Sequence, residues 1–310
     1  MKPQIVDSPT IRAGTRGRRA TRPGDRWYHG WLYVLPAFAI YAFFILYSAG
    51  STVWYSLHRW RGVGEAEWVG LANYVRLLGE PLFHKALLNN LSFAAFYTLL
   101  PIAIGLVLAS VLSQRWLRGA LVYRTLLFLP QVLPMVLIGV IWRWMYHPIF
   151  GPINESLRTF GLGGMARPWL GDFDWALPSV GFVASWYFYG FCMVVFVAGI
   201  QKIDQSLYDA ARVDGASELQ QFRHVTIPGL RREIFVVLIF TFIAALKVFD
   251  LVFVTTRGGP GNETLVASLY LYRNAFQQNL VGYGAAIAVV ITVLVVVIAM
   301  LLRRWQEAGE

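Results

Sequence analysis

The chain has 310 residues, of which 57% are hydrophobic and only 14% are charged. This composition is too apolar for a water-soluble domain of this size and predicts a polytopic membrane protein. The formal net charge of +10 would suit a nucleic-acid-binding protein, but the basic residues are better explained as markers of one side of a membrane. The single cysteine, Cys192, lies in an apolar run and permits no disulfide within the chain.

The N-terminal segment, residues 1–29, is expected to form a disordered basic tail. Its first 26 residues contain seven Lys or Arg among Pro, Gly, Ser and Thr, a composition that cannot bury a core. A cleaved signal peptide is not favoured, because the apolar run that follows is too long for one and shows no small-x-small cleavage site.

Six apolar runs follow, and each is long enough to cross a bilayer, which takes roughly 20 helical residues. The predicted fold is all-α, with a six-helix transmembrane domain over residues 30–302. Pro130 and Pro134 are expected to kink the third span, and Lys247 and Asp250 interrupt the fifth. The spans are expected within residues 27–57 (from near Trp31), 86–114, 125–142, 175–201, 234–256 and 274–302 (from about Tyr283).

The distribution of basic residues predicts the orientation. Six spans place both termini on one side, and that side carries 17 of the 27 Lys and Arg residues. The other side carries nine, and Lys247 lies within the fifth span. Because loops on the cytoplasmic side carry the excess of Lys and Arg, both termini are predicted to be cytoplasmic, including a C-terminal tail of residues 303–310.

The polar, basic island at residues 201–232 separates two apolar runs and is predicted to form two short helices joined by a sharp turn. Asp204 or Ser206 can cap the first helix. Asp214-Gly215 is a turn pair, because glycine tolerates the positive φ that a helix end requires.

The second helix of the island is expected to begin at Ser217, with Gln220 three residues on completing a capping box. Pro228 is expected to end this helix, because proline cannot donate the helical hydrogen bond.

The island resembles the Glu-Ala-Ala loop of bacterial ABC importer permeases. The resemblance rests on Asp209-Ala210-Ala211, Asp214-Gly215-Ala216, Phe222 and Ile227-Pro228, with Asp209 where Glu is usual and Ile227 where Leu is usual. In that family the loop is a coupling helix that docks in a groove of a cytoplasmic ATPase subunit, a helix-in-groove contact. The residues implied in this contact are Tyr208, Asp209, Ala210, Ala211, Arg212, Asp214, Gly215, Ala216, Phe222 and Pro228, together with Leu219 and Arg223.

The resemblance extends over residues 30–302. Residues 68–74, 124–130, 142–144 and 255–260 look like the first permease of carbohydrate-type importers, a group that includes permeases for maltose, trehalose and glycerol phosphate. The last of these segments resembles that group's Thr-x-Gly-Gly-Gly-Pro outer loop with Arg257 in place of one Gly. Its outer docking or scoop-like residues would be Gly258, Gly259 and Pro260.

The resemblance implies a type I importer permease of the bacterial cytoplasmic (inner) membrane. It also implies a second homologous permease subunit, a pair of ATPase subunits and an extracytoplasmic solute-binding protein. The chain contains no nucleotide-binding motif, so it is expected to be non-catalytic and to bind no cofactor, with ATP and Mg held by the partner ATPase. No metal site is expected, because the five histidines have no metal-ligand spacing.

Two ionisable residues in the fifth span are candidates for the solute path. Lys247 and Asp250 are three residues apart, so on a continuous helix they share a face. They either form a mutual salt bridge near the outer membrane surface or face the cavity through which solute moves. Phe249 between them either faces lipid or stacks on a sugar ring.

A set of aromatic and amide side chains is the second candidate for this path. Sugars bind by aromatic stacking and by hydrogen bonds that replace water. Alternatively, the same residues serve as interfacial anchors and contacts between helices. The set comprises Trp186, Tyr187 and Tyr189 in the fourth span, with Asn89, Asn90 and Gln131 elsewhere.

The function predicted from these features is that of a transmembrane permease subunit that moves a sugar or sugar-like solute. One alternative is a permease for another solute class, such as amino acids or peptides. A polytopic membrane enzyme is a second alternative, although the acidic residues are spread among loops and form no cluster. A self-sufficient channel is a third, but a channel has no use for a coupling loop.

Overall fold

The computed structural model describes residues 27–114 and 118–308. It divides into two compact units, residues 1–50 and residues 51–310, each described here by itself. Most of the predicted basic tail over residues 1–29 lies outside the described residues, and the helical structure begins at Trp27.

The described part of the first unit is one apolar helix. It comprises α1 (Trp27–Tyr41), a π-helical turn η1 (Ala42–Tyr47) and the first residues of α2 (Ser48–Ser56), which continues into the second unit. The stretch Tyr33–Ser56, with a mean hydropathy of 1.7, is long enough to cross a membrane and corresponds to the predicted first span.

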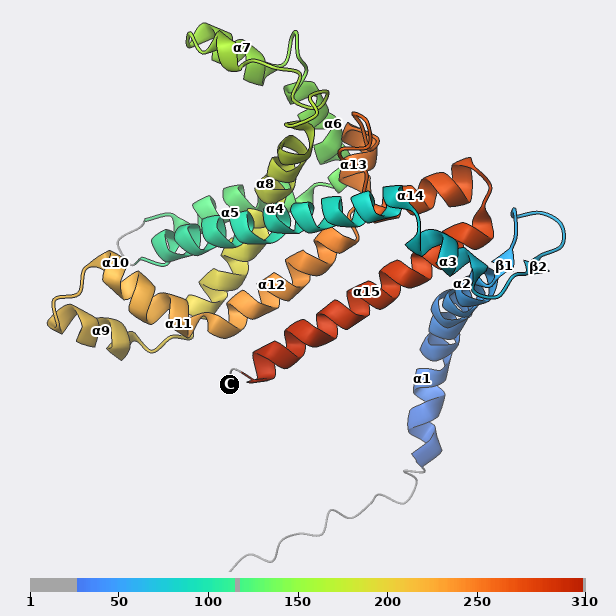
Figure 1. Cartoon of the computed structure of the whole chain (residues 1–310). Coiled ribbons are helices and arrows are strands. Elements are labelled where there is room, and N and C mark those ends of the chain that lie inside the picture. The colour runs from blue at the N-terminus through green and yellow to red at the C-terminus, as the bar shows by residue number, and fades with distance from the viewer. Residues whose placement is uncertain (1–26, 115–117, 309–310) are drawn as a thin grey trace, which may run out of the picture. The chain divides into compact units, whose positions relative to one another are not determined.

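The second unit is almost entirely helical (Figure 1). Its one described sheet is a two-residue antiparallel pair of β1 (His58–Arg59) and β2 (Glu67–Trp68). The helical elements in chain order are α3 (Ala72–Leu78), α4 (Pro81–Leu112), α5 (Ala120–Val132), α6 (Met135–Met145), α7 (Pro152–Thr159), η2 (Gly163–Met165), α8 (Ala176–Ile200), α9 (Gln205–Val213), α10 (Glu218–Gln221), η3 (Phe222–Thr226), α11 (Ile227–Gly229), α12 (Arg231–Leu246), α13 (Asp250–Thr255), α14 (Ala267–Tyr272), η4 (Arg273–Gln277) and α15 (Val281–Ala308).

Four described helical stretches are long and apolar enough to span a membrane, or five if the bent pair α5 and α6 counts as one span. The chain is therefore a helical, multi-pass membrane protein by length and composition, and the six-span prediction is met only in part. The four single helices are Tyr33–Ser56, Pro81–Leu112, Ala176–Ile200 and Val281–Gln306. The last helix, α15, runs on to Ala308 and so enters the predicted C-terminal tail.

The third predicted span is two helices rather than one kinked helix. The axes of α5 and α6 differ by 94°. Pro130 lies inside α5, and the break falls at Leu133 and Pro134. Leu133 has the extended conformation (φ −78°, ψ 142°) that a following proline favours, because the proline ring excludes the helical conformation from the residue before it.

The fifth predicted span is also interrupted. Helix α12 ends at Leu246 and has only 16 residues, and α13 begins at Asp250. The expectation that Lys247 and Asp250 share a helix face is therefore wrong, since Lys247 is the C-cap of one helix and Asp250 the first residue of the next. Phe249, at φ −139° and ψ −61°, has left the helical conformation, and this separates the two side chains.

Helix α4 is the centre of the second unit and packs against both α8 and α12 (Figure 1). It buries one face at helical spacing, with Phe83, Ala86, Asn90, Phe93 and Tyr97 among the buried residues. Van der Waals packing and interhelical hydrogen bonds hold helices together where lipid removes the hydrophobic driving force. Both occur here: the rings of Tyr97 and Phe188 lie 5.1 Å apart, and the hydroxyl of Ser185 donates to the carbonyl oxygen of Phe96 at 2.6 Å.

Candidate functional site

The island between α8 and α12 folds as the sequence predicts up to its second helix. The carboxylate of Asp204 accepts from the backbone N–H of Ser206 at 2.9 Å, so Asp204 is the cap of α9. Gly215 makes the turn with φ at 73°. Ser217 and Gln220 form both hydrogen bonds of the capping box, at 3.4 and 2.7 Å.

The prediction that Pro228 ends the second helix is wrong. The chain stays helical from α10 through η3 to Gly229, and Pro228 lies in the first turn of α11. The π-helical turn η3 explains this, because the backbone N–H of Ile227 bonds to Phe222, five residues back. A wider turn just before the proline leaves room for a ring that would collide with the carbonyl of a regular α-helix.

The segment Asp204–Gly229, called the coupling loop below, is a hairpin held together by side chains. The hydroxyl groups of Tyr208 in α9 and Thr226 in η3 lie 3.0 Å apart, and Thr226 is buried. The side-chain amide of Gln221 donates to the carbonyl oxygen of Ala216 at 2.9 Å. These bonds join the first helix and the turn to the second helix, so the loop is a compact unit rather than a flexible connection.

The coupling loop has two faces of different character. Its inner face presents Gln205, Tyr208, Arg212, Gln221 and Phe222 to a pocket of about 640 Å³. The sequence-predicted contacts Tyr208 and Phe222 are therefore turned inward and half-buried. Of the remaining predicted contacts, Ala211 and Ala216 are half-buried, and the exposed ones are Asp209, Ala210, Arg212, Asp214, Gly215, Leu219, Arg223 and Pro228.

Three branched apolar side chains of the coupling loop are exposed, and together they are called its outer face below. Val213 is 88% exposed, Leu219 75% and Leu207 54%. Leu219 was expected in the ATPase contact, whereas Leu207 and Val213 were not. The sequence signal for Leu207 and Val213 is only that they are large apolar residues within a short polar segment.

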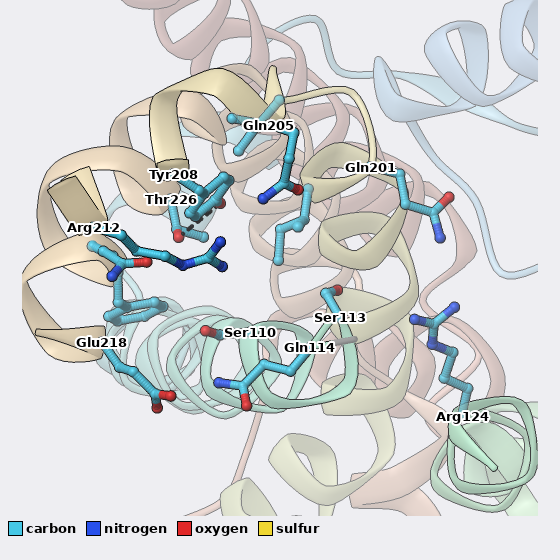
Figure 2. Close-up of a pocket in the computed structure, with 14 residues that line it drawn as sticks. Ser110, Ser113, Gln114, Arg124, Gln201, Gln205, Tyr208, Arg212, Glu218 and Thr226 are labelled. Atoms are coloured by element: carbon cyan, nitrogen blue, oxygen red, sulfur yellow. Dashed lines mark hydrogen bonds between the residues drawn. The ribbon is translucent and has the colours of Figure 1, made fainter. Parts of the chain in front are cut away.

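The inner pocket lies between the coupling loop and the ends of α4 and α8 (Figure 2). Figure 2 shows Gln205 and Arg212 of α9 on one side and Ser110, Ser113 and Gln114 on the other. Arg124 of α5 lies at one end, where its guanidinium donates to the carbonyl oxygen of Leu112 at 2.7 Å. The complete lining is Ser110, Ser113, Gln114, Arg124, Ile200, Gln201, Ile203, Gln205, Tyr208, Arg212, Glu218, Gln221, Phe222 and Thr226.

The residues predicted for the solute path do not meet in one place. Lys247 and Phe249 line a second cavity of about 480 Å³, with Tyr272 and Phe276 and apolar residues of α15. The ring of Phe249 stacks on that of Phe253 at 5.2 Å. Among the described residues, the ion pairs include none between Lys247 and Asp250, and both of these residues are exposed.

The aromatic and amide set lies elsewhere. Most of its members have partners, but the side-chain oxygen Oε1 of Gln131 is buried and has no hydrogen-bond partner among the described residues. Trp186 packs edge-on against Trp142, with ring centres 5.5 Å apart. The hydroxyl of Tyr187 donates to the backbone carbonyl of Gln131 at 3.3 Å, and Tyr189 is half-buried on α8.

Asn90 is buried and its side chain is fully used. Its amide nitrogen donates to the carbonyl oxygens of Ala245 and Leu246, and its amide oxygen accepts from the backbone N–H of Ala267. This residue therefore joins the end of α12 to the start of α14. In this structure Asn90 acts as a contact between elements rather than as part of an open path.

The loop that contains Gly258, Gly259 and Pro260, predicted to lie on the outer side of the membrane, has several internal bonds. The hydroxyls of Thr256 and Thr264 lie 2.6 Å apart, and Thr264 also donates to the carbonyl oxygen of Gly259 at 2.8 Å. An ion pair of 2.6 Å between Lys85 and Glu263 ties the loop to α4. These bonds hold the loop in one conformation, and its predicted docking or scoop-like role stays a prediction.

These features, a helical membrane fold and an exposed capped hairpin between two apolar helices, agree with what the chain resembles in known proteins. Residues 101–309 match the family described as "Binding-protein-dependent transport system inner membrane component". The chain belongs to this family. It is therefore the multi-pass inner membrane component of a binding-protein-dependent transport system, a non-catalytic permease of the ABC type.

Individual relatives cover nearly the whole chain. It is 35% identical to "Probable ABC transporter permease protein YurN" of Bacillus subtilis, over 90% of this chain and 96% of the relative. It is 34% identical to the "Diacetylchitobiose uptake system permease protein NgcF" of Streptomyces coelicolor, over 97% of this chain and 89% of that protein. It is also 34% identical to the "Lactose transport system permease protein LacF" of Rhizobium radiobacter, over 88% of this chain and 92% of that protein.

A solved structure shows the same fold. The chain is similar to one from the crystal structure of a bacterial ABC transporter involved in the import of the acidic polysaccharide alginate, with a TM-score of 0.78. The similarity covers 91% of this chain and 96% of that chain, at 22% sequence identity. This is a permease fold held over nearly the full length of both chains.

Proposed function

We propose that this permease imports a sugar or sugar-like solute, driven by ATP, together with a second homologous permease, a pair of ATPase subunits and an extracytoplasmic solute-binding protein. ATP and Mg are held by the ATPase subunits. The coupling loop is the observation that carries the proposal. It is a bonded hairpin whose apolar side chains Leu207, Val213 and Leu219 remain exposed, as a surface that docks in a groove requires.

The two ends of the coupling loop, where it joins α8 and α12, are packed tightly enough to pass movement of the loop to these helices. Gly199 in α8 lies so close to α12 that an added methyl group would stand 2.5 Å from the side chain of Leu230. Lys202 and Glu233 form an ion pair at 3.3 Å across the same joint. Closure of the ATPase pair would push on the loop, and this joint would pass the push to α8 and α12 as a rigid-body movement.

The sugar class is supported by two relatives, which are named as permeases for lactose transport and for diacetylchitobiose uptake. Aromatic faces at the 480 Å³ cavity, from Phe249, Tyr272 and Phe276, are of the kind on which sugar rings stack. Lys247 lies at the same cavity and would pair with a carboxylate. That residue favours an acidic sugar or an amino acid as the second candidate solute.

We propose six spans, with α5 and α6 together as the third and α12 with α13 as the fifth. The transmembrane domain covers residues 30–302, the tail covers residues 303–310, and both termini are cytoplasmic. Cysteine labelling tests this topology against little background, because the single native cysteine, Cys192, is buried. In intact cells a membrane-impermeant maleimide should label Ser156→Cys but not Ala210→Cys; the reverse pattern would overturn the orientation.

Capture of the ATPase tests the coupling loop. In detergent, wild-type permease should retain the ATPase subunits, and Gly215→Arg should lose them. Gly161→Arg is the matched control, because Gly161 has nearly the same φ (74° against 73°) and the same open space on a different loop. Failure of wild type to retain any ATPase, or equal loss in both variants, would contradict the proposal.

The solute class is tested with the assembled transporter in proteoliposomes. The solute-binding protein is added in three separate assays, with a neutral oligosaccharide, with an acidic oligosaccharide and with an amino acid. ATP hydrolysis is measured in each assay. Stimulation by either saccharide supports the proposal. Stimulation by amino acids alone would replace the sugar with the second candidate.

A further inference from the structure

The 640 Å³ pocket behind the coupling loop is a second candidate site, separate from the solute path. Its volume lies within the range of small-molecule sites, roughly 300–1,000 Å³. Most of the residues that line it carry polar groups, among them the hydroxyls of Ser110 and Ser113, side-chain amides such as those of Gln114 and Gln205, and the guanidinium of Arg124. A pocket of this size with several convergent polar groups can hold a small ligand that forms hydrogen bonds.

Several polar atoms that line the pocket have no partner among the described residues. They are Nε of Arg124, Oγ of Ser113 and Oε1 of Gln114, and all three are shielded from solvent. A buried polar group without a partner is costly, and a buried guanidinium N–H is best satisfied by a charged acceptor. Two of the three atoms, on Arg124 and Ser113, can donate and lie on neighbouring elements.

The pocket has a basic residue at one end and an acidic residue at the other. The charged lining residues are Arg124, Arg212 and Glu218. Arg212 is already paired with Asp209 at 2.9 Å, whereas the Nη2 atom of Arg124 is bonded only to a neutral carbonyl. Figure 2 draws Arg124 and Glu218 at opposite ends of the pocket. An anionic group therefore fits the Arg124 end, and groups that donate hydrogen bonds fit the Glu218 end.

We propose that this pocket binds a phosphate ester of a polyol, with the phosphate at Arg124 and Ser113 and the hydroxyls toward Gln114, Gln221 and Glu218. Phosphate supplies several strong acceptors, which match the free donors at one end. Hydroxyl groups both donate and accept, which matches the amides and the carboxylate at the other. Two sources carry this chemistry: a soluble phosphorylated sugar and the headgroup of an anionic phospholipid.

An occupant of this pocket would touch the coupling loop and the spans at once. Gln205 and Arg212 move with the loop, whereas Ser113 and Arg124 belong to the bundle. A ligand that contacts both the loop and the bundle stabilises one position of the loop relative to the bundle over another. Such a difference in binding free energy is what allows one site to control another. The site would therefore adjust transport from the side of the membrane on which the coupling loop lies.

The first test measures binding of glucose 6-phosphate and of glucose to the assembled transporter in phosphate-free detergent, by calorimetry. The ATP sites are filled beforehand with a non-hydrolysable nucleotide. Glucose 6-phosphate should bind and glucose should not. Arg124→Gln should weaken binding about tenfold or more, because a charge-assisted hydrogen bond is lost. Arg118→Gln is the matched control, since it removes the same charge from an exposed residue outside the lining.

Gln114→Glu is the second variant, because Arg124→Gln also removes the bond to Leu112 and risks misfolding. It keeps the side-chain shape, but it replaces the amide, which can donate to a ligand hydroxyl, with a carboxylate that repels an anionic occupant, so binding should fall about tenfold. Equal binding by Gln114→Glu, Arg124→Gln and Arg118→Gln would overturn the proposal.

The second test distinguishes the two sources. The transporter is placed in nanodiscs of phosphatidylglycerol or of phosphatidylcholine, and bound lipid is counted by native mass spectrometry. A lipid occupant predicts that phosphatidylglycerol is retained by wild type, is lost from Gln114→Glu, and competes with glucose 6-phosphate. A soluble occupant predicts equal binding of glucose 6-phosphate in both lipids. Absence of binding by both phosphate-bearing probes would overturn the proposal without bearing on the import function.

Discussion

The side-chain amide of Asn90 donates to the carbonyl oxygen of Ala245 at 2.9 Å, and this bond lies at the point where α12 ends. The same amide donates to Leu246 at 3.2 Å, and its oxygen accepts from the backbone N–H of Ala267 at 2.8 Å. Helix ends leave carbonyl groups unpaired, and in a buried place they need a partner. Asn90 is a partner for both carbonyls, of which that of Ala245 also accepts from the backbone N–H of Val248 at 3.3 Å, and it thereby stabilises the break that places Lys247 and Phe249 at the cavity wall.

Asn90→Ala should lower the free energy of unfolding by roughly 2–4 kcal/mol, because it leaves buried backbone groups without partners. The measurement is thermal unfolding of the purified permease in detergent, with Ser92→Ala as the control at an exposed position of the same helix. Similar melting temperatures for the two variants would contradict the role assigned to Asn90.

Tyr208→Phe should loosen the coupling loop without changing its outer face. The substitution keeps the ring and removes only the hydroxyl that lies 3.0 Å from Thr226. A hydrogen bond of this kind contributes about 1 kcal/mol, so amide hydrogen exchange in Gln205–Val213 should accelerate about fivefold. Thr226→Ser keeps a hydroxyl and should exchange like wild type; unchanged exchange in Tyr208→Phe would show that the bond does not hold the loop.

Val213→Asp should weaken the contact with the ATPase about tenfold or more while leaving the melting temperature unchanged. The side chain is 88% exposed, so the permease alone does not depend on it. In the complex the substitution would place a charge in an apolar contact. Val63→Asp is the matched control, because Val63 is 89% exposed on another loop. The affinity is measured by titration of purified ATPase, and an unchanged affinity would remove the outer face from the docking surface.

Protonation of Asp204 should open the first turn of α9. The hydrogen bond from the backbone N–H of Ser206 stabilises the carboxylate, and this lowers the pKa of Asp204 below its usual value. A lowered pKa in the folded state means that the contribution to stability is complete above the unfolded pKa, about 3.9, and is lost as the pH falls through the lower folded value.

Hydrogen exchange of that turn, measured from about pH 6 down to about pH 2.5 and corrected for intrinsic rates, checks this prediction. Asp204→Asn keeps a side-chain oxygen as the cap and should abolish the pH dependence. A pH dependence that persists in Asp204→Asn would assign it to another group.

The features of this protein that the sequence predicts are those that depend on residues close together in the chain. The caps at Asp204 and Ser217, the turn at Gly215 and the break beside Pro134 each depend on residues within a few positions of one another. The apolar runs mark the long helices for the same reason, since membrane insertion depends on continuous composition. The motif of the coupling loop is equally local, and it led to the correct family.

The tertiary structure decided what each of these residues faces. Tyr208 and Phe222 turn into the inner pocket, while Leu207 and Val213 stay exposed, because the loop folds back on the ends of α4 and α8. The break between Lys247 and Asp250 depends on Asn90, more than 150 residues earlier in the chain. The pocket beside Arg124 likewise joins six separate elements, α4, α5, α8, α9, α10 and η3. Contacts across such distances depend on how whole helices pack, and no run of neighbouring residues encodes them.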